Sequence, residues 1–407
     1  MRLDVIASTR TPLARAAALV VLAGLGAGFF LQMHARMAHP GGNDLGARLA
    51  AARLLVAGEN PYALQMSQGH GPYPLTIDVL VIPLTWIPLG LAQSLWFLLS
   101  VAALVLSLLI LERLWRQAPD GGGPVLAAPF VVRLAALAVV LFIPLQNHLR
   151  YGQLNLLLLC VCSVFLALQL GEREHGAAAS LGGAIALKLT PVVFLLSLGR
   201  GRRYRAATLA IGWTLLLAVG LPALITSRVL EWYRDGWAPE VIRLSSGPVV
   251  YEWRTRFSLA AVLAELWPRL ATVPGLRYAA AAAVLGPILW VQPRLARDPR
   301  GALFLFALYL TAMPLVSPVS ETHHLAVLAA PLWIWLLAAG CSPRMPVLDG
   351  VGALAVLGAH WLGIALAGPA ASRRGSLFDS AALLALYAVL LSRSLRMTRD
   401  IPARAVA

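Results

Sequence analysis

The sequence has few charged residues and almost no lysine. Only 13% of its 407 residues are charged and 59% are hydrophobic, and the mean hydropathy is +0.76. An ordinary soluble domain has too little interior to bury so much apolar surface. The sequence therefore excludes a typical soluble protein and predicts an integral membrane protein.

Cysteine is also scarce, with three residues in the whole chain. Cys160 and Cys162 lie within one apolar stretch and Cys341 ends another. This placement provides neither a disulfide framework nor the spacing of a metal site, so we interpret the three as packing residues.

The apolar residues occur in continuous stretches, and they lack the two-residue alternation of a membrane barrel. The predicted fold is therefore an all-α polytopic membrane protein, with one integral membrane domain over 1–407 and about twelve transmembrane helices. We expect the first stretch to be an uncleaved helix, and 257–268 to be too short to cross. The predicted spans are 13–33, 75–89, 91–111, 125–145, 154–170, 178–198, 206–226, 275–293, 301–316, 323–341, 346–367 and 377–394.

Arginine clusters flank these spans. The net charge is +15, and all 33 basic residues except Lys188 are arginine. By the positive-inside rule the clusters are cytoplasmic, which leaves 34–74 and 227–274 as external loops. The loops at 112–124 and 146–153 carry too little charge to be assigned to either side of the membrane. The sequence has no face that combines basic and aromatic residues, so it does not predict nucleic acid as a partner. The clusters are Arg2–Arg15, Arg200–Arg205, Arg294–Arg300 and Arg393–Arg404.

Two adjacent histidines, His323 and His324, follow the polar segment 317–322 between two long apolar stretches. The charge pattern puts this segment at the outer membrane edge. Ionisable side chains are costly there, so Glu321 and the two imidazoles predict a functional site. The alternative is a polar turn that happens to contain histidines, although Ser, Gly or Asn would serve a turn as well.

A second polar centre lies just outside the first predicted helix. Residues 46–57 are rich in Ala, Leu and Arg and predict an amphipathic helix on the outer surface. Asp44, near its start, is either a reactive carboxylate or one that the helix dipole favours, and the two roles are compatible. Tyr62 and Tyr73 are individually weak signals, since tyrosine is common at membrane interfaces. Asp78, inside the next span, needs a partner or water.

Lys188 lies well inside an apolar stretch, and Gln153 and Asn155 open another. A lone ammonium group in a membrane usually has an anionic partner. The alternative is a lysine that snorkels to the interface, because Pro191 and the Arg200 cluster indicate that the helix end is near.

Six polar motifs follow one another in order. They are Asp44, Asn60-Pro61-Tyr62, Tyr73-Pro74-Leu75, Gly152-Gln153-Leu154-Asn155, Lys188-Leu189-Thr190-Pro191, and Ser317-Pro318 followed by His323-His324. In this order they resemble glycosyltransferase family 87, GT-C class membrane enzymes that include a mycobacterial polyprenol-phosphate-mannose-dependent α-1,2-mannosyltransferase. The resemblance spans 44–330. It implies a lipid-linked sugar donor, transfer on the outer face of the cell membrane, and inversion at the anomeric carbon.

The chain departs from the family pattern at two places. Leu75 stands where the family usually has a second proline, and Glu321 and Thr322 stand where it often has tryptophan and Asp or Ser. These departures leave the sugar and the acceptor open. Mannose is the sugar that the resemblance implies, with arabinose or another sugar as an alternative, and the acceptor is a glycolipid or glycan of the cell envelope.

The chemistry of such a reaction suits these residues. A polyprenyl phosphate leaving group is already an anion, so it needs cations and hydrogen-bond donors rather than a strong general acid. His323, His324, Lys188 and Arg256 can supply them. The acceptor hydroxyl needs a base on the opposite side, and Asp44 is the predicted base. We expect no cofactor and no obligatory metal, with a bound divalent ion left open. The other predicted substrate-binding residues are Tyr62, Tyr73, Gln153, Asn155 and Glu321.

Two alternatives come from other classes. A secondary transporter could use intramembrane Lys, Asp and His as its site, but the sequence has no matching halves. A transferase also needs a substantial outer segment such as 34–74, whereas a carrier usually has short external loops. A membrane-bound acyltransferase using one histidine would not require an aspartate just after the first helix.

Overall fold

The described part of the chain is helical. The computed structural model describes residues 3–37, 44–67, 73–118, 129–249, 257–340 and 372–400, and these contain no strand. The all-α prediction is therefore confirmed for them. The elements are α1 (Leu3–Met37), α2 (Asp44–Val56), α3 (Pro61–Ser67), α4 (Thr76–Leu80), η1 (Ile82–Trp86), α5 (Leu89–Gln117), α6 (Phe130–Val140), α7 (Phe142–Tyr151), α8 (Asn155–Leu170), α9 (Glu174–Leu187), η2 (Thr190–Val192), α10 (Val193–Arg200), α11 (Tyr204–Leu215), η3 (Leu216–Gly220), α12 (Leu221–Ala223), α13 (Val229–Trp232), η4 (Tyr233–Trp237), α14 (Ala238–Ser246), α15 (Leu259–Leu266), η5 (Pro268–Thr272), α16 (Leu276–Leu295), α17 (Pro299–Val316), η6 (Thr322–Leu328), α18 (Ala329–Gly340) and α20 (Ser372–Asp400).

Five stretches in these ranges are long and apolar enough to cross a membrane. They are the main part of α1, α5, the run from α11 to α12, α17, and residues 380–398 of α20. The pair α6 and α7, bent by 82°, makes a sixth if it is one span. Fewer continuous spans are found than the twelve or so expected, because several apolar stretches form short or broken helices. The predicted span 346–367 lies outside the described residues.

The breaks have local causes. Pro83 and Pro88 restrict the stretch at 75–89, which forms only α4 and the 3₁₀ helix η1. Lys188 is extended, with φ −159° and ψ 132°, and it separates α9 from η2. Gly152, at φ 65°, ends α7 in the left-handed conformation that glycine adopts without strain. Non-helical backbone at membrane depth must be buried in protein, and Gly152 and Lys188 are indeed buried, so these two breaks lie inside the bundle. The break at η1 is different, because none of the η1 residues is buried.

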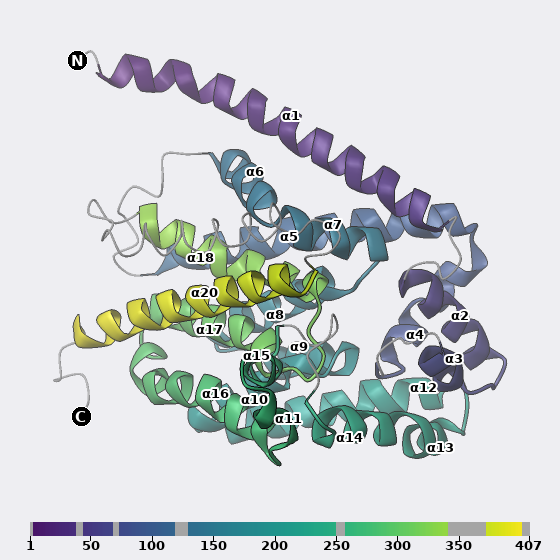
Figure 1. Cartoon of the computed structure of the whole chain (residues 1–407). Coiled ribbons are helices and arrows are strands. Elements are labelled where there is room, and N and C mark those ends of the chain that lie inside the picture. Colours follow the sequence, from purple (N-terminus) through teal and green to yellow (C-terminus); the bar gives the residue numbers. More distant parts are fainter. Residues whose placement is uncertain are drawn as a thin grey trace.

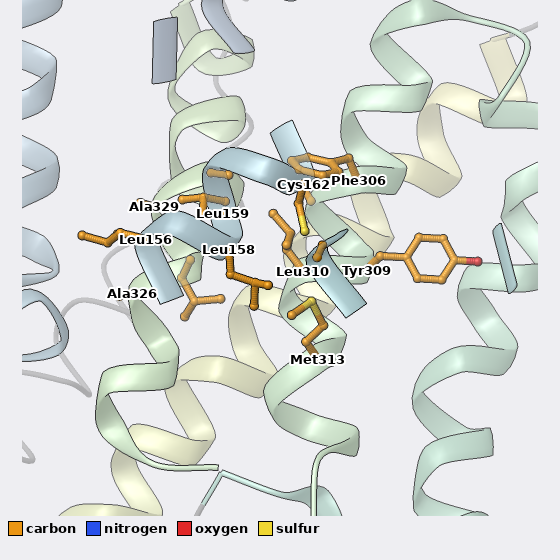
Figure 2. Packing of buried hydrophobic residues seen from close by; sticks show 14 of the residues in the cluster. Leu156, Leu158, Leu159, Cys162, Phe306, Tyr309, Leu310, Met313, Ala326 and Ala329 are labelled. Atoms are coloured by element: carbon orange, nitrogen blue, oxygen red, sulfur yellow. The ribbon is translucent and has the colours of Figure 1, made fainter. Parts of the chain in front are cut away.

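The core lies between α5, α8, α17 and α18. Figure 2 shows Leu158 and Cys162 of α8 near Leu310 and Met313 of α17, and all four belong to one buried cluster. Cys162 is thus a packing residue, as expected. In Figure 1, α2, α3 and α4 lie at the end of the bundle away from the two chain termini. The short helix α15 at 257–268 is consistent with the expectation that this stretch does not cross.

Helices α9 and α11 approach closely at Gly182. A Cβ atom there would lie 2.5 Å from Cβ of Trp213 and 2.6 Å from the carbonyl oxygen of Ala210. We expect Gly182→Ala to lower the free energy of unfolding by about 1 to 3 kcal/mol, because the helices must separate to admit the methyl group. Melting of the purified protein measures this. Gly183→Ala is the control, since its Cβ would meet only Leu217 at 3.8 Å; equal melting temperatures for the two variants would contradict the close packing.

Candidate active site

A buried ion pair joins α2 to α4. Arg48 of α2 lies 3.4 Å from Oδ1 of Asp78 in α4, and both side chains are buried. The partner that Asp78 needed is therefore Arg48. The sequence argument missed Arg48, which is four residues after Asp44 and so on the same face of the helix. That spacing is the signal that could have identified it.

Tyr73 lies between two cations. The guanidinium carbon of Arg48 is 4.3 Å from the centre of the Tyr73 ring, and Nζ of Lys188 is 5.4 Å from it. Both distances are within the range of cation–π attraction. Burial raises the pKa of the Tyr73 phenol above its ordinary value, and the Asp44 carboxylate adds to the effect. The phenol therefore stays protonated and remains a hydrogen-bond donor.

Tyr62 supports the segment that carries Tyr73. Its side chain is fully buried, and its hydroxyl donates to the Tyr73 carbonyl oxygen at 3.0 Å. Its ring lies 6.0 Å from that of Tyr233, whose hydroxyl accepts the backbone N–H of Leu75 at 3.0 Å. Nothing in the sequence distinguished the two tyrosines, but they differ in the structure. Tyr62 holds the backbone of Tyr73, and the Tyr73 ring contacts Arg48 and Lys188.

Lys188 is linked to the histidine segment through one amide. Its Nζ donates to Oδ1 of Asn155 at 2.9 Å, and Nδ2 of Asn155 donates to the carbonyl oxygen of His323 at 3.0 Å. The carboxylates whose charges act on the ammonium are those of Glu321 and Asp44. Since Lys188 is buried, its side chain does not snorkel to a lipid surface. The anionic surroundings expected for Lys188 are therefore present.

The two histidines differ in their surroundings. Their rings are 4.4 Å apart and nearly perpendicular, at 82°. Nδ1 of His324 accepts the backbone N–H of Glu321 at 3.0 Å, within a reciprocal capping box at the start of η6. A neutral His324 therefore carries its proton on Nε2 and presents a donor there. Nδ1 of His323 lies 3.6 Å from Oε2 of Glu321, which leaves that carboxylate able to orient the ring.

A third histidine, His148 of α7, was not identified from the sequence. It is fully buried, and neither ring nitrogen has a hydrogen-bond partner in the part of the chain that the structure describes. The charge of Lys188 acts on it, and it acts in turn on His324. Its carbonyl oxygen accepts the backbone N–H of Gln153, which is also buried, at 3.0 Å. The signal was weak, because an isolated histidine near a helix end is usually only a packing or surface residue.

Two predictions remain open at this point. Arg256 lies outside the described residues. Within the described ranges, no group of three or more His, Cys, Asp or Glu side chains could hold a metal ion, and independence from metal stays a prediction. Most of the other predicted residues are linked by contacts or by the action of their charges; these are Asp44, Tyr73, Asn155, Lys188, Glu321, His323 and His324.

Comparison with known proteins gives one family. Residues 72–318 match the model of glycosyltransferase family 87, and these 247 of 407 residues are more than half of the chain. A polyprenol-phosphate-mannose-dependent alpha-(1-2)-phosphatidylinositol pentamannoside mannosyltransferase of Mycobacterium tuberculosis (strain CDC 1551 / Oshkosh) is 28% identical over 300 residues, covering 73% of this chain and 63% of the relative. A phosphatidylinositol mannoside mannosyltransferase of strain ATCC 25618 / H37Rv with the same donor dependence is 28% identical over 276 residues, covering 66% and 60%.

The match spans less than two thirds of the length of these curated relatives. Among solved structures, ArnT from Cupriavidus metallidurans bound to undecaprenyl phosphate aligns over 95% of this chain and 77% of its own, with a TM-score of 0.44 and 16% identity.

Proposed function

The chain belongs to glycosyltransferase family 87, and we propose that it transfers a sugar from a polyprenyl-phosphate donor to a hydroxyl group of a glycolipid or glycan. Mannose is the proposed sugar, because the two mycobacterial relatives are named as polyprenol-phosphate-mannose-dependent mannosyltransferases. We place the reaction on the outer face of the plasma membrane, with inversion at the anomeric carbon.

The observation that carries the proposal is the chain of contacts from Lys188 through Asn155 to the histidine segment. It holds a buried ammonium whose charge acts on His324, and the neutral His324 ring has its N–H on Nε2. An ammonium and an N–H donor are the groups that a phosphate requires. Lys188 and His324 would therefore hold the carrier phosphate, and the phenol of Tyr73 is a third donor nearby.

The proposed step forms one bond and breaks one. The acceptor oxygen attacks the anomeric carbon while the bond from that carbon to the phosphate oxygen breaks, and the bonding electrons leave with the phosphate. The proton of the acceptor hydroxyl moves to the Asp44 carboxylate. Polyprenyl phosphate departs with one more negative charge than it had in the donor, and Lys188 stabilises this added charge.

The histidines divide the remaining roles. Nδ1 of His324 is occupied by the backbone N–H of Glu321, so the neutral ring has no free acceptor and cannot take the acceptor's proton. His323, with Glu321 beside its Nδ1, is the alternative base. The proposal thus has two candidate bases, Asp44 first and His323 second, which substitution distinguishes.

The direct test is an assay with purified protein, polyprenyl-phosphate mannose and total membrane lipid. A new mannolipid that depends on the protein, together with its loss from the envelope of cells lacking the gene, is the expected result by mass spectrometry. A secondary transporter would instead move a solute without forming a glycosidic bond. No new product with any polyprenyl-phosphate sugar would contradict the proposal.

The orientation in the membrane can be tested with single cysteines. After Cys160, Cys162 and Cys341 are replaced by serine, we expect Glu59→Cys to react with an impermeant thiol reagent in intact cells. Arg203→Cys should react only after the cells are permeabilised, because the Arg200–Arg205 cluster is expected in the cytoplasm. Both positions are exposed, so access through the membrane is the only difference measured. If only position 203 is labelled in intact cells, the protein has the opposite orientation in the membrane.

A further inference from the structure

A second polar cluster lies in a different part of the bundle, where α5 ends and α17 begins. Arg133 of α6 donates from Nη2 to Oε2 of Glu112 at 2.6 Å, and its guanidinium carbon lies 5.1 Å from the Trp333 ring. The guanidinium carbon of Arg300 lies 5.3 Å from the ring of Trp115, one turn after Glu112 on α5. We call Glu112, Trp115, Arg133, Arg300 and Trp333 the arginine–tryptophan cluster.

The cluster contains buried donors with no acceptor. Nε1 of Trp115, Nε1 of Trp333, Nε of Arg133, and both Nε and Nη2 of Arg300 are buried and have no hydrogen-bond partner among the described residues. All five are N–H groups. Trp115, Arg133 and Trp333 are exposed by only 3%, 4% and 0%, so water does not readily satisfy them. Buried polar groups normally find partners, and one anion held between these side chains would accept hydrogen bonds from several of these donors at once.

The charges show the same deficit. Glu112 pairs through one oxygen with Arg116 and through the other with Arg133. Arg300 has no carboxylate partner within the described part of the chain, where its one recorded contact is the Trp115 ring. Of the three guanidinium groups, those of Arg116 and Arg133 therefore pair with Glu112, and that of Arg300 does not. Stacking on tryptophan explains where the Arg300 side chain lies, but it compensates neither its charge nor its N–H groups.

The surroundings identify the source of the anion. Arg300 belongs to one of the predicted cytoplasmic arginine clusters. The Trp115 ring packs on the Phe304 ring, with 6.4 Å between the two ring centres. Arg393, of another such cluster, lies 5.8 Å from the Phe304 ring. The end of α5, which its own charge could not place, is therefore at the cytoplasmic end of the bundle. Tryptophan and arginine together are typical of the membrane interface, where the inner leaflet presents anionic headgroups.

We propose that the arginine–tryptophan cluster binds the phosphate group of an anionic phospholipid of the cytoplasmic leaflet. The guanidinium of Arg300 and the indole N–H of Trp115 donate to the phosphate oxygens, and Arg133 contributes its free Nε–H. Arg116, with 60% of its side chain exposed, is at the rim where a headgroup enters. This site is separate from the candidate active site and does not depend on the proposed transfer reaction.

The test uses the full-length protein in detergent, titrated with phosphatidylglycerol, with phosphatidylcholine, and with inorganic phosphate. Binding is read by native mass spectrometry and by the shift in melting temperature. We expect phosphatidylglycerol to bind and stabilise, and Arg300→Gln to weaken its binding about ten-fold. Arg294→Gln is the matched control and should bind as the parent does, because Arg294 also stacks on a tryptophan, Trp290 at 5.6 Å, but is exposed.

Each result decides the question. Equal binding of phosphatidylcholine, equal stabilisation by inorganic phosphate, or equal losses in Arg294→Gln and Arg300→Gln would overturn the proposal of a specific lipid site. Trp115→Phe keeps the ring and removes only the N–H group, so it tests the same site if Arg300→Gln does not fold. It should melt near the parent temperature without lipid and show weaker stabilisation by phosphatidylglycerol. Unchanged stabilisation in Trp115→Phe would remove Trp115 from the site.

Discussion

Asp44→Asn is expected to lower sugar transfer by about 10² to 10⁴, the usual range for a positioned general base, while donor binding stays close to that of the parent. Asparagine keeps the size of the side chain and most of its hydrogen bonding but cannot accept a proton. Asp44→Glu should also be impaired, because the longer side chain misplaces the carboxylate.

The substitution also separates the two roles of Asp44. Asp44 is the first residue of α2, where a carboxylate is favoured by the helix dipole, and asparagine serves the start of a helix about as well as aspartate. A loss of turnover with unchanged melting temperature therefore reports proton transfer rather than folding. The measurement is kcat and donor affinity with purified protein and an identified acceptor.

A near-normal rate in Asp44→Asn would reduce Asp44 to a helix-start residue. The base would then be His323, oriented by Glu321 at 3.6 Å. Glu321→Gln distinguishes the two cases, because it should reduce kcat strongly only if the imidazole needs that carboxylate. With Asp44 as the base, Glu321→Gln should leave kcat close to that of the parent.

Hydropathy predicted where the helices lie better than where they break. The single apolar stretch 178–198 is two helices, because Lys188 is extended between them and Pro191 begins the next turn. The described part of the stretch 125–145 likewise forms α6 and the start of α7, and these two helices are sharply bent at Leu141. A hydropathy average over a window of residues does not detect such points. The side-chain partner of Lys188, Asn155, lies on another helix, α8.

The polar pairs of the site show the same limit. The sequence indicated that Lys188 and Asp78 needed partners, but it could not say that Asn155 and Arg48 supply them. Arg48 is 30 residues from Asp78, and Lys188 is 33 residues from Asn155. Such pairings are set by how the helices pack. The ordered motifs indicated the family, which the family match confirms, but local periodicity does not encode the contacts between their residues.

Lys188→Met is expected to weaken donor binding about 10- to 100-fold, the effect of losing one hydrogen bond to a charged group. Methionine keeps most of the length and the apolar part of the side chain, so the break between α9 and η2 can persist. The loss should appear in the affinity for polyprenyl phosphate. The affinity for the uncharged polyprenol should stay the same, since no phosphate is present for the ammonium to bind.

This comparison separates charge from packing. Removing Lys188 also leaves Oδ1 of Asn155 without its donor, which could shift the His323 carbonyl that Asn155 holds. A shift of that kind would weaken the binding of both polyprenyl phosphate and polyprenol and would lower the melting temperature. Loss of the ammonium alone would weaken only the binding of polyprenyl phosphate. Lys188→Arg, which keeps the charge, should retain more affinity for polyprenyl phosphate than Lys188→Met. If Lys188→Met binds and turns over donor like the parent, the carrier phosphate is held elsewhere, and the buried ammonium is a structural link between α9 and α8.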